Sequence, residues 1–237
     1  MTGPNPGALA AILGQTRCLL LDFDGPVCAV FAGYHAPVIA DELRTVIAAN
    51  GGTITPEIQA ADGPHNVLRL TAEANEPHVT RAVADALRGA EIAAVASAQP
   101  TPGADEVLRA ARDSGRRVAI VSNNAEQAVH AYLDHHALAG TVDRVIARYD
   151  HMHPRLLKPA SHLVQLALTI LHSPATEAVF VGDSTSDIAA GRTESVPTIG
   201  YADKPGKRNR LADAGADAII DTMTELGNAL RANQAPA

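Results

Sequence analysis

The sequence predicts a doubly wound α/β fold, in which helices cover both faces of a parallel sheet. Short apolar runs recur along the chain, and residues 18–22 and 178–182 are typical of strands buried on both faces of such a sheet. Helical patterns separate these runs from residue 103 onward. Strands that alternate with helices favour a parallel sheet over sandwiches and bundles.

Six apolar runs are expected to form the sheet. They are residues 18–22, 117–121, 143–147, 178–182, 197–200 and 217–220. The helices expected between and after them are residues 103–114, 125–138, 160–172, 185–194, 204–214 and 222–231. The first of these ends at Gly115, a residue type common just beyond a helix. Residues 1–14 and 231–237 are expected to be loosely ordered ends of the chain.

Residues 28–98 interrupt the alternation, and they are predicted to be a helical insertion without strands. Thr55 before Pro56 and Gly63 before Pro64 are typical of helix starts. The predicted domains are therefore a catalytic core of residues 1–27 and 99–237 and a cap of residues 28–98. An insertion beside one end of a sheet is a candidate lid over a site.

Composition excludes several classes of protein. The chain has 237 residues, of which 46% are hydrophobic and 19% charged, as in an ordinary globular protein. Lys and Arg number 19 and Asp and Glu 26, so the net charge of −7 argues against a nucleic-acid partner. The basic residues Lys204, Lys207, Arg208 and Arg210 are interpreted as a solvated helix face.

The location is predicted to be cytoplasmic. The sequence contains no apolar stretch of the roughly 18 residues that a membrane span needs, and its start does not resemble a secretory signal. Cys18 and Cys28 are too few for a disulfide framework, so both are expected to be reduced. The sequence leaves the oligomeric state open.

Polar side chains gather where the predicted strands end. In an open α/β sheet, ligands bind outside the carboxyl ends of the strands. The strand ends and the loop after the third strand bring these residues to one edge: Asp22, Asp24, Ser122, Asn123, Asn124, Lys158, Asp183 and Asp187. Four clustered carboxylates require a cation, and oxygen ligands without Cys or His suit Mg²⁺ rather than Zn²⁺. A carboxylate nucleophile with Mg²⁺, a lysine and hydroxyl donors is typical of phosphoryl transfer.

Six motifs in order carry a resemblance to a known family. They are LLLDFDGPV (19–27), AIVSNN (119–124), LLKP (156–159), VFVGDSTSDIAAG (179–191), IGYADKPGK (199–207) and AGADAII (214–220). The sequence resembles the haloacid dehalogenase superfamily, and specifically its phosphoglycolate-phosphatase-like branch with a helical cap. The resemblance covers approximately residues 17–228.

The resemblance implies a role for each matching residue in catalysis. Asp22 would attack phosphorus and form an aspartyl-phosphate, and Asp24 would protonate the leaving oxygen and later activate water. Ser122 and the amide of Asn123 would bind the phosphoryl oxygens. Lys158 would offset the charge of the nucleophile and the phosphoryl group.

The resemblance also implies a metal site. Asp22, the backbone carbonyl of Asp24 and Asp183 would hold Mg²⁺, and Asp187 would support the metal-bound waters and Lys158. The sequence departs from the family pattern at Pro26-Val27, where Thr-Leu is usual. This departure leaves the catalytic side chains intact.

The implied function is a Mg²⁺-dependent phosphatase that acts on a small phosphomonoester. Two alternatives stay open: a sugar phosphomutase that uses the same pair of aspartates, and a non-catalytic protein that binds a phosphate ligand. The cap residues His35, His65 and Arg69 could face the pocket, but each is interpreted as a surface residue. His151-Met152-His153 is interpreted as a polar loop, with a role near the leaving group as the alternative.

Overall fold

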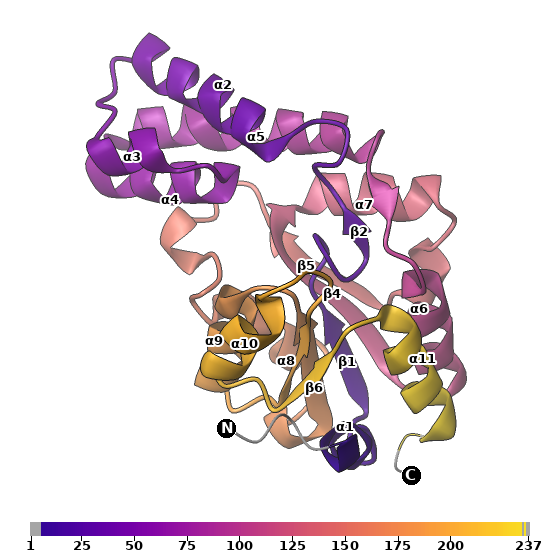
Figure 1. Ribbon diagram of the computed structural model, residues 1–237. Coiled ribbons are helices and arrows are strands. Elements are labelled where there is room, and N and C mark those ends of the chain that lie inside the picture. Colours follow the sequence, from indigo (N-terminus) through magenta and orange to yellow (C-terminus); the bar gives the residue numbers. More distant parts are fainter. Residues whose placement is uncertain (1–5, 234, 236–237) are drawn as a thin grey trace.

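The computed structural model describes residues 6–233 and 235, and its centre is a parallel sheet (Figure 1). Within these residues, six strands form the sheet in the order β5-β4-β1-β6-β7-β8. Their bounds are β1 Cys18–Leu21, β4 Arg117–Ala125, β5 Arg144–Arg148, β6 Ala178–Gly182, β7 Thr198–Tyr201 and β8 Ala218–Ile220. All six predicted runs are strands, and the predicted α/β fold is confirmed.

The register of the sheet places the site. β1 lies between β4 and β6, and Leu21 pairs with both Ile120 and Val181. The chain therefore leaves β1 level with its two neighbours, and the residues that follow these strands meet at one edge.

Helices cover both faces of the sheet. Alternate residues of β1 divide between two apolar clusters, Leu19 and Leu21 in one and Cys18 and Leu20 in the other. The first cluster includes residues of α6 (Ala104–Asp113), α7 (Glu126–His135) and α11 (Met223–Ala232), and the second includes residues of α8 (His162–Ile170) and α9 (Thr185–Thr193). α10 (Lys207–Asp213) packs on β7 and β8. Short 3-10 turns are η1 Ala139–Thr141, η2 Pro154–Leu156 and η3 Ala175–Glu177.

The prediction of loosely ordered ends is wrong for part of each end. Residues 6–13 form the helix α1 (Pro6–Leu13), because Leu13 is fully buried in the core and Ile12 packs against it. α11 continues to Ala232, and Ala235 donates a backbone hydrogen bond to Ser114. Residues 1–5, 234 and 236–237 lie outside the described residues.

The insertion consists mainly of helices, which form a separate layer beyond the end of the sheet (Figure 1). Its helices are α2 Ala36–Ala49, α3 Pro56–Ala60, α4 Pro64–Ala74 and α5 Pro77–Val95. α3 begins as predicted, with the Thr55 side chain accepting a hydrogen bond from the Ile58 amide at 3.3 Å. α4 begins at Pro64, also as predicted.

The prediction that residues 28–98 contain no strand is wrong at their first residues. β2 (Cys28–Ala29) pairs antiparallel with β3 (Gln99–Pro100) where the chain enters and leaves the insertion. A two-residue strand has no recognisable sequence pattern, and this one exists because the two connecting segments lie side by side. Both cysteines are buried and free.

The helices of the insertion share apolar contacts with the sheet. Ile39, Leu43 and Leu87 belong to the same buried cluster as Leu20 and Phe180. In the part of the chain that the structure describes, no helix combines the length and apolarity needed to cross a membrane.

Candidate active site

A tight turn after β1 positions the two predicted catalytic aspartates. The Asp22 amide donates to Val181 O at 2.9 Å, which continues the pairing with β6. The Asp24 carboxylate accepts a hydrogen bond from the Val30 amide at 2.9 Å. Gly25 has φ of +115°, and a Cβ there would lie 2.5 Å from Cγ of Asp183. Glycine is therefore required for the first and fourth motifs to approach each other.

Lys158 lies at the centre of the site. Its Nζ lies 2.7 Å from Oδ1 of Asp22, 2.6 Å from Oδ1 of Asp187 and 3.0 Å from the carbonyl oxygen of Val121. Burial by itself would lower the pKa of Lys158, but Asp187 and Asp22 outweigh it and raise the pKa. The lysine therefore stays a cation between two carboxylates, although its side chain is buried.

Asp187 is fixed by the start of α9. Its carboxylate accepts from the Ser184 amide at 3.0 Å, and the Ser184 hydroxyl accepts from the Asp187 amide, so the two form a capping box. Gly182 lets this side chain approach, since a Cβ there would lie 2.3 Å from Cβ of Asp187. Asp187 combines the helix-capping role with a contact to Lys158.

Asp183 pairs with Lys207, which was predicted to lie on a solvated helix face. The Lys207 ammonium contacts Oδ2 of Asp183 and lies 2.6 Å from Oδ1 of Asp203. Its side chain is 13% exposed, so the solvated-face interpretation is wrong for Lys207. Burial and the neighbouring Asp187 raise the pKa of Asp183 to about 6, while Lys207 opposes the rise. In the sequence, the spacing of four residues between Asp203 and Lys207 indicated that Lys207 could pair with a carboxylate.

The second motif forms a bulged loop. The register between β4 and β5 shifts between Val121 and Ala125, so the intervening residues leave the ladder. Asn123 clamps the lysine loop: its Oδ1 accepts from the Lys158 amide at 2.8 Å, and its Nδ2 donates to the Lys158 carbonyl at 3.1 Å. Ser122 is buried, and its hydroxyl donates to Oδ1 of Asn124 at 3.0 Å.

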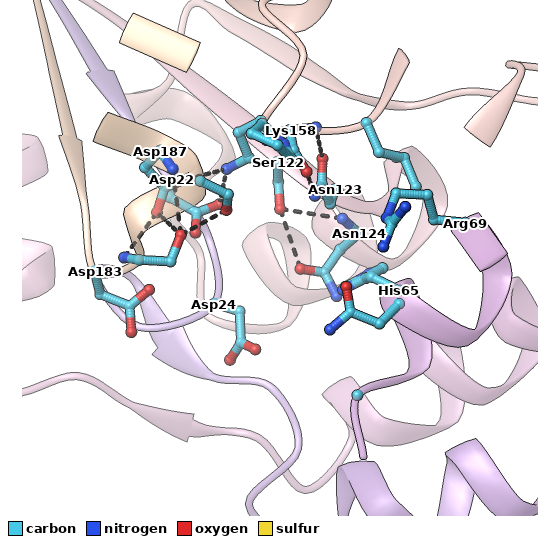
Figure 2. Close-up of a pocket in the computed structure, with 16 residues that line it drawn as sticks. Asp22, Asp24, His65, Arg69, Ser122, Asn123, Asn124, Lys158, Asp183 and Asp187 are labelled. Atoms are coloured by element: carbon cyan, nitrogen blue, oxygen red, sulfur yellow. Dashed lines mark hydrogen bonds and ion pairs between the residues drawn. The ribbon is translucent and has the colours of Figure 1, made fainter. Parts of the chain in front are cut away.

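These groups surround a cavity of about 270 Å³. Its charged and polar lining includes Asp22, Asp24, His65, Asn66, Arg69, Ser122, Asn123, Asn124, Lys158, Asp183 and Asp187. Figure 2 shows His65 and Arg69 on the side opposite the aspartates. The structure thus brings together all the site residues that the sequence predicted.

The structure corrects the interpretation of the insertion's polar residues. His65 and Arg69 are not simply surface residues, because α4 carries both into the lining of the cavity. His35 is exposed before the start of α2 and does not line this cavity. His151 and His153 line a different cavity, between α5 and the loop after β5. They do not line the cavity that contains Asp22, Asp24 and Asp183.

The aspartates fit a divalent cation. One carboxylate oxygen each of Asp22, Asp183 and Asp187 lies within 4.8 Å of the others. Burial raises the pKa of Asp22 to about 8, with Asp187 adding to the rise and Lys158 opposing it. Lys158 and Lys207 contact these carboxylates, and a bound cation would favour the ionised form of the acids whose pKa values burial raises. Oxygen donors of this kind suit a hard cation.

The chain resembles known hydrolases in sequence. A profile described as haloacid dehalogenase-like hydrolase matches residues 16–193. The chain is 27% identical over 201 residues to phosphoglycolate phosphatase of Rhodospirillum rubrum, with 81% of this chain and 77% of the relative covered. It is 26% identical over 222 residues to phosphoglycolate phosphatase of Pseudomonas syringae pv. syringae, with coverages of 89% and 78%.

A solved structure supports the fold. CbbY from Rhodobacter sphaeroides, in complex with phosphate, aligns with a TM-score of 0.66 at 20% identity and covers 91% of this chain and 99% of its own. The predicted resemblance, the fold and the assignment as an enzyme are confirmed together. With the profile covering the first, second and fourth motifs and the lysine loop, the chain belongs to the haloacid dehalogenase-like hydrolase family.

Proposed function

We propose that this protein is a Mg²⁺-dependent phosphatase that hydrolyses a small phosphomonoester through an aspartyl-phosphate. The observation that carries the proposal is the pairing of Asp22 with Lys158 at 2.7 Å beside Asp24 in one cavity. Relatives named phosphoglycolate phosphatase support a phosphatase in particular.

Asp22 is the proposed nucleophile. One of its carboxylate oxygens attacks phosphorus, the bond from phosphorus to the ester oxygen breaks, and an aspartyl-phosphate forms. Lys158 contacts Asp22 and would offset charge on the incoming phosphoryl group. Ser122 and the amide of Asn123 would bind the phosphoryl oxygens, since both residues line the cavity next to Lys158.

Asp24 is the proposed general acid and base. Burial raises its pKa, although the Val30 amide, His65 and Lys207 oppose the rise, so the protonated form is favoured relative to a solvated aspartate. The acid gives its proton to the leaving oxygen. It then takes a proton from the water that attacks the aspartyl-phosphate, and inorganic phosphate and free Asp22 result.

The proposed metal ligands are Asp22, the backbone carbonyl of Asp24 and Asp183, with Asp187 as support. Bound Mg²⁺ would supply positive charge beside the nucleophile and the phosphoryl oxygens. The clustering of the three carboxylates and the raised pKa values of Asp22 and Asp183 support this assignment. Lys207 would keep Asp183 ionised before the cation arrives.

The division into domains is also proposed from this arrangement. Residues 1–27 and 99–237 form the catalytic core, and residues 28–98 form a cap that faces the strand ends. The antiparallel pairing of β2 with β3 joins the two connecting segments and supports a boundary there. Because α4 contributes His65 and Arg69 to the cavity wall, the cap would contact the part of the substrate beyond its phosphoryl group.

Two other functions use the same residues. A phosphomutase would need the same aspartates but would depend on a bisphosphate primer. A non-catalytic phosphate-binding protein would retain the cavity without turnover.

We expect the enzyme to be cytoplasmic. We also expect it to act on small molecules rather than nucleic acid, in line with the acidic net charge of −7.

A panel of small phosphate esters tests the proposal. Phosphate release should require added Mg²⁺, should stop with chelator, and should be abolished by Asp22→Asn, with Asp85→Asn as a control that leaves the site unchanged. Turnover that requires a bisphosphate would favour the mutase. Phosphate binding without release from any ester would favour the non-catalytic protein.

A further inference from the structure

A buried ion pair between Glu91 and Arg148 lies behind the second motif, and the proposed mechanism does not use it. Glu91 is in α5 and is 0% exposed, and Arg148 is the buried last residue of β5. The Glu91 Oε2 atom contacts the Arg148 guanidinium. Burying a carboxylate is costly unless the group is paired and hydrogen-bonded, so these contacts require an explanation.

Residues 122–125, the bulged end of β4 and here called the phosphate loop, pair only in part with β5. Residues 122–124 fall in the register shift, and pairing resumes where Ala125 lies opposite Arg148. Backbone groups that leave a ladder need other hydrogen-bond partners when they are buried.

The ion pair supplies hydrogen-bond partners to three consecutive residues, through two backbone groups and the Asn124 side chain. The Ala125 amide donates to Glu91 Oε2 at 2.9 Å, and Nδ2 of Asn124 donates to Glu91 Oε1 at 3.3 Å. The Arg148 Nε group donates to the Asn123 carbonyl at 3.2 Å. The inserted helix α5 therefore holds the loop from one side while β5 holds it from the other.

The same contacts reach Ser122. An ionised carboxylate only accepts hydrogen bonds, so Glu91 orients the side-chain amide of Asn124 with its nitrogen toward the Glu91 carboxylate. The Asn124 Oδ1 atom then faces the Ser122 hydroxyl, which donates to it at 3.0 Å. Glu91 thus acts on the position of Ser122 through Asn124. To bind a phosphoryl oxygen, the hydroxyl would turn its single proton away from Asn124.

Glu91 also contacts a residue of α4 that lines the cavity. His65 Nε2 lies 2.8 Å from Glu91 Oε1, and His65 lines the cavity from α4. Although burial alone would raise the pKa of Glu91, Arg148, His65 and the Ala125 amide hold it below its usual value. The carboxylate therefore stays ionised and can accept all these hydrogen bonds at once.

We propose that Glu91, together with Arg148, is a positioning residue that sets the geometry of the phosphate loop and of His65, and so couples the inserted helices to phosphate binding. The proposal rests on the proposed function, because it requires residues 122–125 to bind the phosphoryl group. It goes further by giving the insertion a role in forming the phosphate site itself.

The deciding variant is the double substitution Glu91→Leu/Arg148→Met. Replacing a buried ion pair by apolar side chains of similar volume often leaves stability unchanged. Here the replacement also removes every hydrogen bond that the pair makes to the phosphate loop. We expect the double variant to melt below the wild type, because the Ala125 amide, the Asn124 side-chain amide and the Asn123 carbonyl lose buried hydrogen-bond partners. We expect the affinity for inorganic phosphate, measured by calorimetry with Mg²⁺, and kcat/KM to fall about 10²-fold, as for a displaced catalytic group.

Two further variants complete the test. Glu91→Gln keeps one acceptor for the loop and should recover part of the phosphate affinity relative to the double variant. Asp85→Asn, on the same helix, removes an exposed partner of Arg88 at 3.0 Å and should change neither phosphate affinity nor turnover.

A folded double variant with wild-type phosphate affinity and kcat/KM would overturn the proposal, because the pair would then serve stability alone. If the double variant does not fold, Glu91→Gln decides: weaker phosphate binding than the wild type supports the proposal, and unchanged binding overturns it. Failure of the proposed function shows differently, as a wild-type protein that releases no phosphate from any ester.

Discussion

Each carboxylate of the site has a distinct chemical environment, although four of them lie in one cavity. Asp22 and Asp187 share the Lys158 ammonium, whereas Asp183 has Lys207. Asp24 is held by a backbone amide instead of a cation. Differences of this kind separate the pKa values of neighbouring acids and allow one to act as nucleophile and another as acid.

Asp24→Asn should separate the two chemical steps. An alkyl ester needs a proton for its leaving oxygen, whereas nitrophenolate leaves as a stable anion, and general acid help is worth about 10²–10⁴-fold. We therefore expect alkyl phosphate turnover to fall much more than the first step with p-nitrophenyl phosphate. The second step lacks its base, so rapid mixing should show a burst of nitrophenol followed by slow turnover.

Asp22→Asn is the matched comparison and should abolish both the burst and the turnover. Equal losses for alkyl and aryl esters in Asp24→Asn, with no burst and no phosphoenzyme trapped, would show that Asp24 is not the acid and base.

Asp183→Asn should lower Mg²⁺ affinity because it removes a charged ligand from a hard-cation site. Activity at low Mg²⁺ should fall severely, and a high concentration of Mg²⁺ should restore part of it. Calorimetric titration with Mg²⁺ measures the effect without turnover. Unchanged Mg²⁺ binding in this variant would mean that the cation is held elsewhere.

At the scale of elements, each motif is positioned by the way a strand ends. The turn after β1 closes at Gly25, β4 ends in a bulged loop, and α9 begins with the capping box that fixes Asp187. α4 adds His65 and Arg69 from outside the sheet. In the proposed mechanism the core elements would contact the phosphoryl group, and α4 would contact the remainder of the substrate.

Substitutions in α4 should change substrate preference. Arg69→Met removes a cation from the cavity wall, so we expect its kcat/KM to fall more for esters with a second anionic group than for neutral alkyl phosphates. A panel of matched esters measures the ratio. Glu73, which pairs with Arg69 at 2.7 Å, provides the comparison Glu73→Gln, which should preserve the cation. A uniform loss across the panel would mean that α4 only excludes water.

At the scale of the whole molecule, the site is costly to fold without a cation. The folded-state pKa of Asp22 is raised from 3.8 to about 8, and that of Asp183 from 3.8 to about 6. Above pH 3.8 and up to these raised values, the folded protein therefore binds more protons than the unfolded chain. The free energy of unfolding of the metal-free protein should therefore fall as pH rises from about 4 to about 8.

Melting curves in chelator and in Mg²⁺ at about pH 5 and about pH 8 test this expectation. Mg²⁺ binds the ionised carboxylates, so it should raise the melting temperature more at the higher pH. Asp183→Asn should reduce the difference between the two pH values. An equal Mg²⁺ effect at both would contradict the role of these carboxylates.

Much of the fold and the site was predictable because the signals are local. A continuous apolar run such as residues 178–182 is typical of a buried strand, and parallel strands bring their carboxyl ends together. Asp22, Asp24 and Asp183 follow directly from that rule, whereas Lys158 was predicted from its Lys-Pro motif in the loop after β5. One further signal was present: Glu91 continues the buried spacing of Val83 and Leu87 along α5, where an acid needs a partner.

The sequence by itself determined the alternation of strands and helices, the edge that carries the site and the kind of chemistry available there. Only the tertiary structure decided which cations meet which carboxylates, because Lys207 and Arg148 reach partners that lie far away in the sequence. It also decided that α4 faces the aspartates and that Leu13 anchors α1. Side-chain contacts between distant segments depend on how the layers pack, and no local pattern encodes them.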